Sequence, residues 1–143
     1  MGILFRPAHL ADAPGLVPLV EELGYPAPGA QIAARLARLL AAQDQLVVVA
    51  EEERALLGWI HAQEFLSLAS DPAALVTGLV VDPAARRRGI GRGLVAAVEA
   101  WARARGLVSL RLRTRVARRD AQAFYLSLGF ELAKRQLQFR KEL

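Results

Sequence analysis

One segment constrains the fold more than any other, because in it an apolar stretch at residues 75–81 leads through a Gly- and Arg-rich turn into an amphipathic helix. In residues 90–105 the apolar side chains recur at three- and four-residue steps, which is helical spacing. Gly106 ends this pattern, and residues 107–113 then alternate as a strand does. The segment predicts a strand–helix–strand unit and places the chain among the mixed α/β proteins.

The remaining elements extend this layered α/β arrangement. Asp12 predicts a helix start, and Pro18 predicts a kink or a short first turn in that helix. Further strands are expected at 3–6, 46–50, 56–65 and 134–140, and further helices at 29–42 and 119–128.

The composition is typical of one globular domain, which we expect to span residues 1–143. Hydrophobic residues make up 54% and charged residues 23% of the sequence. With no Cys and only two His, His9 and His61, we predict no metal site. No stretch approaches the roughly 18 apolar residues of a membrane span, and the first residues do not match a signal peptide. We therefore expect a cytoplasmic protein.

Basic residues are concentrated in one third of the sequence. Residues 86–119 contain eleven Arg and a single acid, Glu99, a net charge of +10, whereas the remainder has eight basic and thirteen acidic residues, a net charge of −5. This asymmetry predicts an anionic partner. A nucleic acid is one such partner. The low aromatic content of 6% and the absence of a base-stacking pattern argue against it.

The turn at residues 82–89 has the features of a phosphate site. Three consecutive Arg, at positions 86–88, precede Gly89 and Gly91 at the predicted helix start. The first amides of a helix lack partners, the helix dipole favours anions, and Gly lets a phosphate come close to the backbone. The pattern matches neither a Walker loop nor a dinucleotide fingerprint. We predict a cradle for a phosphate or diphosphate.

A second motif lies in the predicted helix at 119–128, where Phe124-Tyr125 is followed by Gly129-Phe130. Together with Val81-Asp82-Pro83 and the Arg86-to-Gly91 turn, it resembles the GNAT family, the GCN5-related N-acetyltransferases. The resemblance covers essentially the whole chain. It implies a central, mostly antiparallel sheet flanked by about four helices. It also implies an enzyme that transfers an acetyl group from acetyl-CoA to a primary amine by direct attack in a ternary complex.

The resemblance implies where acetyl-CoA binds. Its pantetheine would lie along Leu79, Val80 and Val81 like an added strand, in a V-shaped opening between this strand and the one after the long helix. A backbone N–H of Leu79 or Val80 would polarise the thioester carbonyl. The other residues expected to bind the cofactor, mostly through backbone amides at the diphosphate, are Arg86, Arg87, Arg88, Gly89, Ile90, Gly91, Arg92 and Arg118.

Tyr125 matches the general acid of the family, since a phenol with a pKa of about 10 can protonate a departing thiolate with a pKa of about 8.5. Two positions depart from the family pattern. Arg118 stands where Asn often contacts CoA, and Thr77 stands where Glu often acts as, or holds, the general base. We name Glu64 as the candidate base, with His61 and a water relay as alternatives.

The sequence says less about the site of the amine that accepts the acetyl group. The resemblance implies that residues 23–31 and 66–72 wall the site of a small-molecule or peptide amine, which Glu21 and Glu22 could attract. It also implies a possible homodimer. The alternatives are a basic nucleic-acid-binding module and a non-catalytic acyl-CoA-binding domain, the latter because Thr77 cannot act as a base. An acceptor carried on RNA is also possible.

Overall fold

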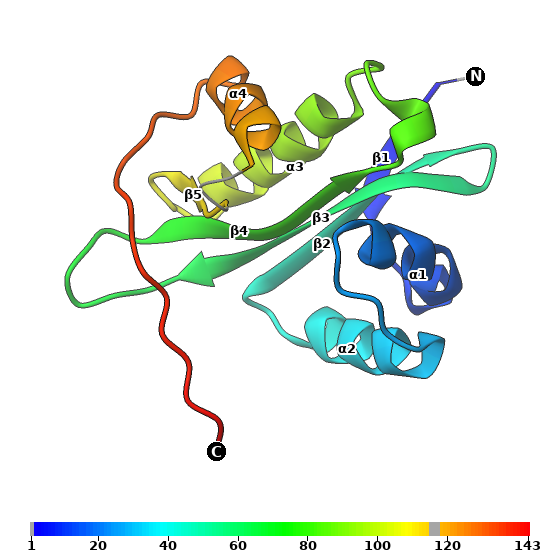
Figure 1. Ribbon diagram of the computed structural model, residues 1–143, viewed down its shortest axis with the longest axis horizontal. Helices are drawn as coiled ribbons and strands as arrows, with labels where there is room; N and C mark the ends of the chain where they lie inside the picture. Colours follow the sequence, from blue (N-terminus) through cyan, green and yellow to red (C-terminus); the bar gives the residue numbers. More distant parts are fainter. Residues whose placement is uncertain (1, 115–117) are drawn as a thin grey trace. The chain divides into compact units, whose positions relative to one another are not determined.

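The computed structural model describes residues 2–114 and 118–143 of the chain (Figure 1). The chain divides into two compact units, Met1–Arg113 and Thr114–Leu143. The first unit holds the sheet and three α-helices, and the second holds one α-helix and the C-terminal segment. No helix in the described part of the chain is long and apolar enough to span a membrane.

The elements follow the order expected from the sequence up to the last helix. They are β1 (Leu4–Pro7), the 3-10 helix η1 (Leu10–Asp12), α1 (Ala13–Glu22), α2 (Gly29–Ala41), β2 (Gln45–Glu52), β3 (Ala55–Phe65), β4 (Ala73–Val81), the 3-10 helix η2 (Pro83–Ala85), α3 (Ile90–Ala104), β5 (Leu110–Leu112) and α4 (Arg119–Ser127). The strands lie side by side in sequence order, and only the β4–β5 pair is parallel. The mixed α/β fold with a mostly antiparallel sheet and four helices is therefore confirmed.

Helices cover both faces of the sheet, with α1 and α2 on one face and α3 on the other (Figure 1). The alternation of β3 produces these two faces. Trp59 packs against the apolar cluster of α1, α2 and β2, whereas a side chain at Gly58 would point at Ile90 and Leu94 of α3. Ile90 and Leu94 are almost fully buried there, so α3 is anchored to the middle of the sheet.

The first helix begins where Asp12 predicts it, but its N-terminus lacks the expected side-chain cap. Asp12 stands at the N-cap of α1, but its carboxylate makes no cap hydrogen bond to that helix. Instead it accepts two hydrogen bonds of 2.8 Å from Arg6 and one of 2.7 Å from the His9 amide. The last of these satisfies the N-cap amide of η1. The helix also continues through Pro18 as one element. The charge of Arg6 in β1 explains why the carboxylate turns away from α1.

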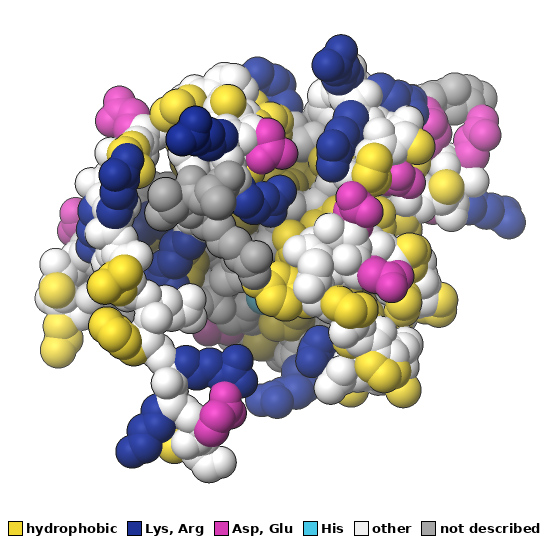
Figure 2. Space-filling model, in the orientation of Figure 1, with side chains coloured by type: hydrophobic (Ala, Val, Ile, Leu, Met, Phe, Trp, Pro, Cys, Tyr) yellow, Lys and Arg dark blue, Asp and Glu magenta, His cyan; other side chains and the backbone are white. Residues whose placement is uncertain are grey.

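The strand predicted at 134–140 is wrong. The segment from Phe130 to Leu143 forms neither a helix nor a strand. Leu137 and Phe139 alternate as strand residues do, yet both are largely exposed. Apolar side chains are visible at several places on the face drawn in Figure 2. An alternating pattern forms a strand only when a neighbouring strand supplies backbone partners, and none pairs with this segment among the described residues.

Candidate functional site

An irregularity in β4 is the starting point of the site. His61 pairs with Gly78, but the next residue along β3, Ala62, pairs with Val76, so Thr77 is an extra residue without an opposite partner. This is a β-bulge, which re-aims the residues that follow it. β5 pairs with β4 only from Ala74 to Val76. In the described part of the chain, β4 therefore has no neighbour on that side beyond the bulge.

Two hydrogen bonds show how the bulge turns the backbone. The Ala74 amide donates to Ser109 at 2.9 Å, away from β3, whereas the Asp82 amide donates to Leu57 at 2.8 Å, toward β3. Amides two residues apart in a strand point to the same edge, so without an extra residue both would point the same way. Beyond the bulge, the N–H groups of Leu79 and Val81 consequently point away from β3.

The three residues predicted to bind the pantetheine therefore do not all face the same edge of β4. Leu79 and Val81 present their peptide groups at the open edge of β4. Val80 presents its peptide group to β3, and its side chain is buried. Of the two amides predicted to polarise the thioester, that of Leu79 points to the open edge and that of Val80 points to β3.

The open edge of β4 leads directly into the predicted phosphate turn. Asp82 begins this turn, and its side chain accepts a hydrogen bond of 3.0 Å from the Ala84 amide. Gly89 is the N-cap of α3 with φ +76°, a left-handed conformation that favours Gly. The first helical bond runs from the Gly93 amide to the Gly89 carbonyl at 3.0 Å, so the amides of Ile90, Gly91 and Arg92 have no acceptor within α3.

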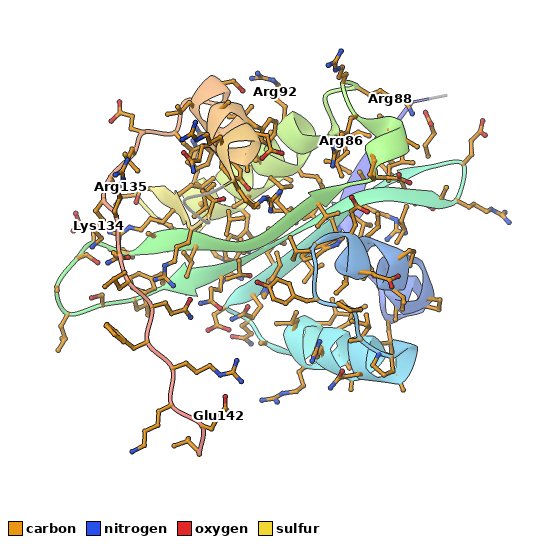
Figure 3. The ribbon with its side chains drawn as sticks, viewed as in Figure 1. Arg86, Arg88, Arg92, Lys134, Arg135 and Glu142 are labelled. Carbon is orange, nitrogen blue, oxygen red and sulfur yellow. The ribbon has the colours of Figure 1, made fainter. Side chains whose placement is uncertain are left out.

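The four predicted Arg side chains of this region differ in how they are held; Figure 3 labels Arg86, Arg88 and Arg92. Arg88 forms two hydrogen bonds to Glu52 at 2.9 and 2.6 Å, and Arg86 lies 4.0 Å from Glu22. Arg87 has a positive φ of 65°, and its side chain is exposed. Arg92 is exposed in the first turn of α3. Because Arg88 is already paired, Arg87 and Arg92 are the cations that offer their charge most directly to an anion at the turn.

Two glycines near the turn serve packing. A Cβ on Gly93 would collide with the ring of Phe5 in β1, so Gly93 lets α3 approach the sheet. Gly91 is buried, as is the side chain of Ile90. Ile90 and Gly91 can therefore contact a ligand only through their backbone amides.

Glu64, the named candidate base, lies on the α3 face of the sheet. Its carboxylate binds Arg105, just after α3, at 2.8 Å. His61 lies on the opposite face, where Val47, its partner in β2, belongs to the α1/α2 cluster. The two side chains considered as the general base, Glu64 and His61, therefore lie on opposite faces of the sheet.

His61 is hydrogen-bonded on both ring nitrogens. Its Nδ1 lies 2.7 Å from Thr77 Oγ1 and its Nε2 lies 2.6 Å from Gln45 Oε1. Burial lowers the pKa of this imidazole. The contact with Thr77 was not foreseen in the sequence, because it depends on the bulge.

Tyr125 belongs to the second unit. Its ring packs between Phe124, with ring centroids 5.5 Å apart, and Phe130, at 5.9 Å. Burial raises the pKa of the phenol, and the nearby positive charge of Arg118 lowers it by less. The phenol therefore keeps its proton at neutral pH, as a general acid requires. Arg118 is exposed at the N-cap of α4.

The predicted acceptor walls carry exposed side chains. Glu21 and Glu22 are exposed at the end of α1. Leu66 and Leu68 are exposed in the loop between β3 and β4.

Within the described ranges, no three His, Asp or Glu side chains are grouped as a metal ion would need.

Comparison with known proteins places the chain in a family. The family model described as "Acetyltransferase (GNAT) family" matches residues 18–130. The chain therefore belongs to the GNAT acetyltransferase family. The match includes β4, the turn, α3 and the Tyr125 helix.

The relatives found by sequence share a more specific name. An "Aminoglycoside N(6')-acetyltransferase type 1" of Serratia marcescens is 35% identical over 74 residues, which cover 52% of this chain and 51% of the relative. The relative of the same name from Stenotrophomonas maltophilia is 38% identical over 74 residues, covering 52% and 48%. The matched segment thus spans about half the length of these relatives.

Solved structures share the fold. Aminoglycoside N-acetyltransferase AAC(6')-Iy in complex with CoA has a TM-score of 0.89 at 23% identity, covering 99% of this chain and 96% of that one. Aminoglycoside 6'-N-acetyltransferase AAC(6')-Ih from Acinetobacter baumannii has a TM-score of 0.87 at 21% identity, covering 99% of each chain. At these identities the likeness is one of fold.

Proposed function

We propose that this protein is an acyl-CoA-dependent N-acetyltransferase that transfers the acetyl group of acetyl-CoA to a primary amine. One observation carries the proposal: the bulge at Thr77 turns the Leu79 and Val81 amides to an edge of β4 that no described strand pairs with. This edge leads directly to a helix N-terminus whose first amides have no acceptor within α3 and whose Arg side chains are exposed. An extended amide chain that ends in phosphates, as CoA is, matches this arrangement of strand edge and anion site.

In this mechanism the pantetheine pairs with the edge of β4 and the Leu79 N–H donates to the thioester carbonyl oxygen. That hydrogen bond stabilises the negative charge that develops when the amine attacks. The diphosphate binds at the amides of Gly89 to Arg92, with Arg87 and Arg92 supplying charge. Arg118 is proposed to bind a further CoA phosphate.

Tyr125 is proposed as the general acid that protonates the departing sulfur. Its raised pKa supports this role, because the proton stays on the phenol until thiolate forms. Glu64 lacks comparable support as the base, since its carboxylate is paired with Arg105.

The acceptor is proposed to be a primary amine of a small molecule or peptide. Aminoglycosides are the first class to test, because the relatives carry that name. Sisomicin is a suitable probe, since a metagenomic aminoglycoside acetyltransferase of the same fold was solved in complex with it.

The cytoplasmic location and the homodimer remain predictions.

The test measures release of CoA thiol from acetyl-CoA in the presence of sisomicin, with the wild type and the Tyr125→Phe variant. We expect turnover by the wild type and a fall in kcat of roughly 10²-fold in the variant, which is typical of losing a general acid. The Kd for acetyl-CoA serves as the control and should be unchanged, because the substitution preserves the ring packing. Undiminished kcat in the variant would exclude Tyr125 as the acid.

A further inference from the structure

A row of polar side chains on the α1/α2 face of the sheet ends at the bulge. His61 lies at its centre, 2.7 Å from Thr77 Oγ1 and 2.6 Å from Gln45 Oε1. The amide nitrogen of Gln45 donates in turn to Gln63 Oε1 at 3.4 Å. The register sets this row, because Gln45 pairs with Gln63 and His61 lies beside the bulge.

These hydrogen bonds determine which nitrogen of His61 carries the proton. Because the amide nitrogen of Gln45 faces Gln63, its carbonyl oxygen faces His61, and a carbonyl oxygen can only accept. Nε2 therefore carries a hydrogen and donates it to Gln45, which leaves the Nδ1 lone pair to accept from Thr77. The other acceptor within reach of the Thr77 hydroxyl, the His61 carbonyl oxygen, is farther away at 3.4 Å.

The imidazole is a neutral base. Burial lowers its pKa, so it is uncharged at neutral pH. Among the described residues it forms no ion pair: Glu64 of the same strand binds Arg105 on the opposite face. The other charged residues on the elements packed around it are exposed or paired. Asp44 before β2, Glu21 and Glu22 of α1, and Arg35 and Arg38 of α2 are exposed. Glu51 and Glu52 of β2 are half-buried and bind Arg6 and Arg88, respectively.

We propose that Thr77 and His61 form a proton relay that takes the proton of the attacking amine, with Thr77 as the catalytic residue and His61 as the residue that positions its hydroxyl and receives the proton. The proposal rests on the function proposed above. Thr77 is exposed at the bulge and precedes Leu79 by two residues, so its hydroxyl lies next to the strand edge assigned to the thioester. A hydroxyl alone is too weak a base, and the imidazole behind it supplies the basicity.

The step conserves atoms and charge. The neutral amine nitrogen forms a bond to the carbonyl carbon and becomes more acidic as it does so. Its N–H proton passes to Thr77 Oγ1 while the Thr77 hydroxyl proton passes to His61 Nδ1. The C–S bond then breaks, its electron pair stays on sulfur, and the sulfur is protonated. The proton held by His61 returns through solvent to the group that protonated the sulfur, so amine and acetyl-CoA give amide and CoA.

Kinetics with sisomicin and acetyl-CoA tests the relay. Thr77→Val removes the hydroxyl with little change of shape, and Thr77→Ser is the matched variant that keeps it. We expect kcat to fall roughly 10²-fold in Thr77→Val, to stay within about threefold of wild type in Thr77→Ser, and the KM for acetyl-CoA to change in neither. A Thr77→Val variant with the kcat of the wild type overturns the relay.

The pH profile distinguishes a relay from a structural hydrogen bond. Only the neutral imidazole accepts a proton, so kcat/KM of the wild type should rise with pH through the pKa of His61, which lies below its usual 6.5. Thr77→Val should lack this rise, because its residual activity no longer passes through His61. An identical rise in both proteins contradicts the proposal.

Nitrogen-15 NMR of the imidazoles provides a readout that needs no turnover. The sequence has only two His, so the exposed His9 is an internal reference. We expect His61 in the Nε2–H form, with an Nδ1 resonance that shifts in Thr77→Val while the His9 signals stay fixed. An Nδ1–H form, or no shift, overturns the relay. A wild type with the expected spectrum but no CoA release contradicts the proposed function instead.

Discussion

Gly58 in β3 and Gly78 in β4 have no room for a side chain, because neighbouring atoms lie directly against their backbone. A Cβ on Gly58 would lie 2.6 Å from the Val80 carbonyl oxygen, and one on Gly78 would lie 2.5 Å from the Trp59 ring. Both glycines adjoin the part of β4 that follows the bulge. Gly58 lets the Val80 carbonyl lie close to β3, and Gly78 lets the Trp59 ring lie on β4, in the segment whose amides the bulge has turned.

Replacing Gly58 by Ala should destabilise the protein. The new methyl clashes with the Val80 carbonyl oxygen, which as a backbone atom cannot move cheaply, while Ile90 and Leu94 of the core lie in contact at 3.4 Å and leave it no room to shift. We expect the free energy of unfolding in urea to fall by about 2–3 kcal/mol, as for overpacked cores. Gly29→Ala at the start of α2 is the control, because its nearest contact is an ordinary 3.8 Å and its stability should not fall. Equal stability of the two variants would refute this account.

The elements differ in how far the sequence predicts them. The strand, turn and helix through residues 75–105 were predicted because apolar spacing and Gly positions act locally. The bulge was not, since residues 75–81 read as one continuous strand and only the hydrogen bonds to neighbouring strands reveal the extra residue. The contact between His61 and Thr77 has the same origin. The strand at 134–140 failed because a pattern alone supplies no pairing partner.

The two ends of α3 allow a matched test of the proposed phosphate cradle. Gly89 and Gly106 both have a positive φ, +76° and +72°, and both have open space where a Cβ would be. Replacing either by Ala should cost about 1–2 kcal/mol of stability through backbone strain. Only Gly89→Ala should also weaken acetyl-CoA binding, because Gly106 lies about 22 Å away along a 15-residue helix.

Calorimetric titration with acetyl-CoA distinguishes the two ends. Equal weakening of binding by both variants would show that general destabilisation, rather than the cradle, is responsible. Unchanged binding in both would remove the turn from the CoA site.

At the scale of the whole molecule, the basic segment is less of an anion-binding surface than its net charge predicts. Several of its Arg side chains are paired with acids: Arg86 with Glu22, Arg88 with Glu52, Arg103 with Glu99 and Arg105 with Glu64. Three of these four acids lie outside the segment, so they offset three of its ten net positive charges. This favours a small anion at one turn over a nucleic acid along the whole segment.

The most direct test of the central claim is a calorimetric titration of the wild type with acetyl-CoA, compared with acetyl-CoA that lacks the 3′-phosphate. The account predicts binding with a Kd on the order of 1 μM, about −8 kcal/mol, and weaker binding of the dephosphorylated form. The absence of binding at millimolar acetyl-CoA, in a sample shown to be folded, would contradict the assignment of the β4 edge and the Gly89 turn as an acyl-CoA site.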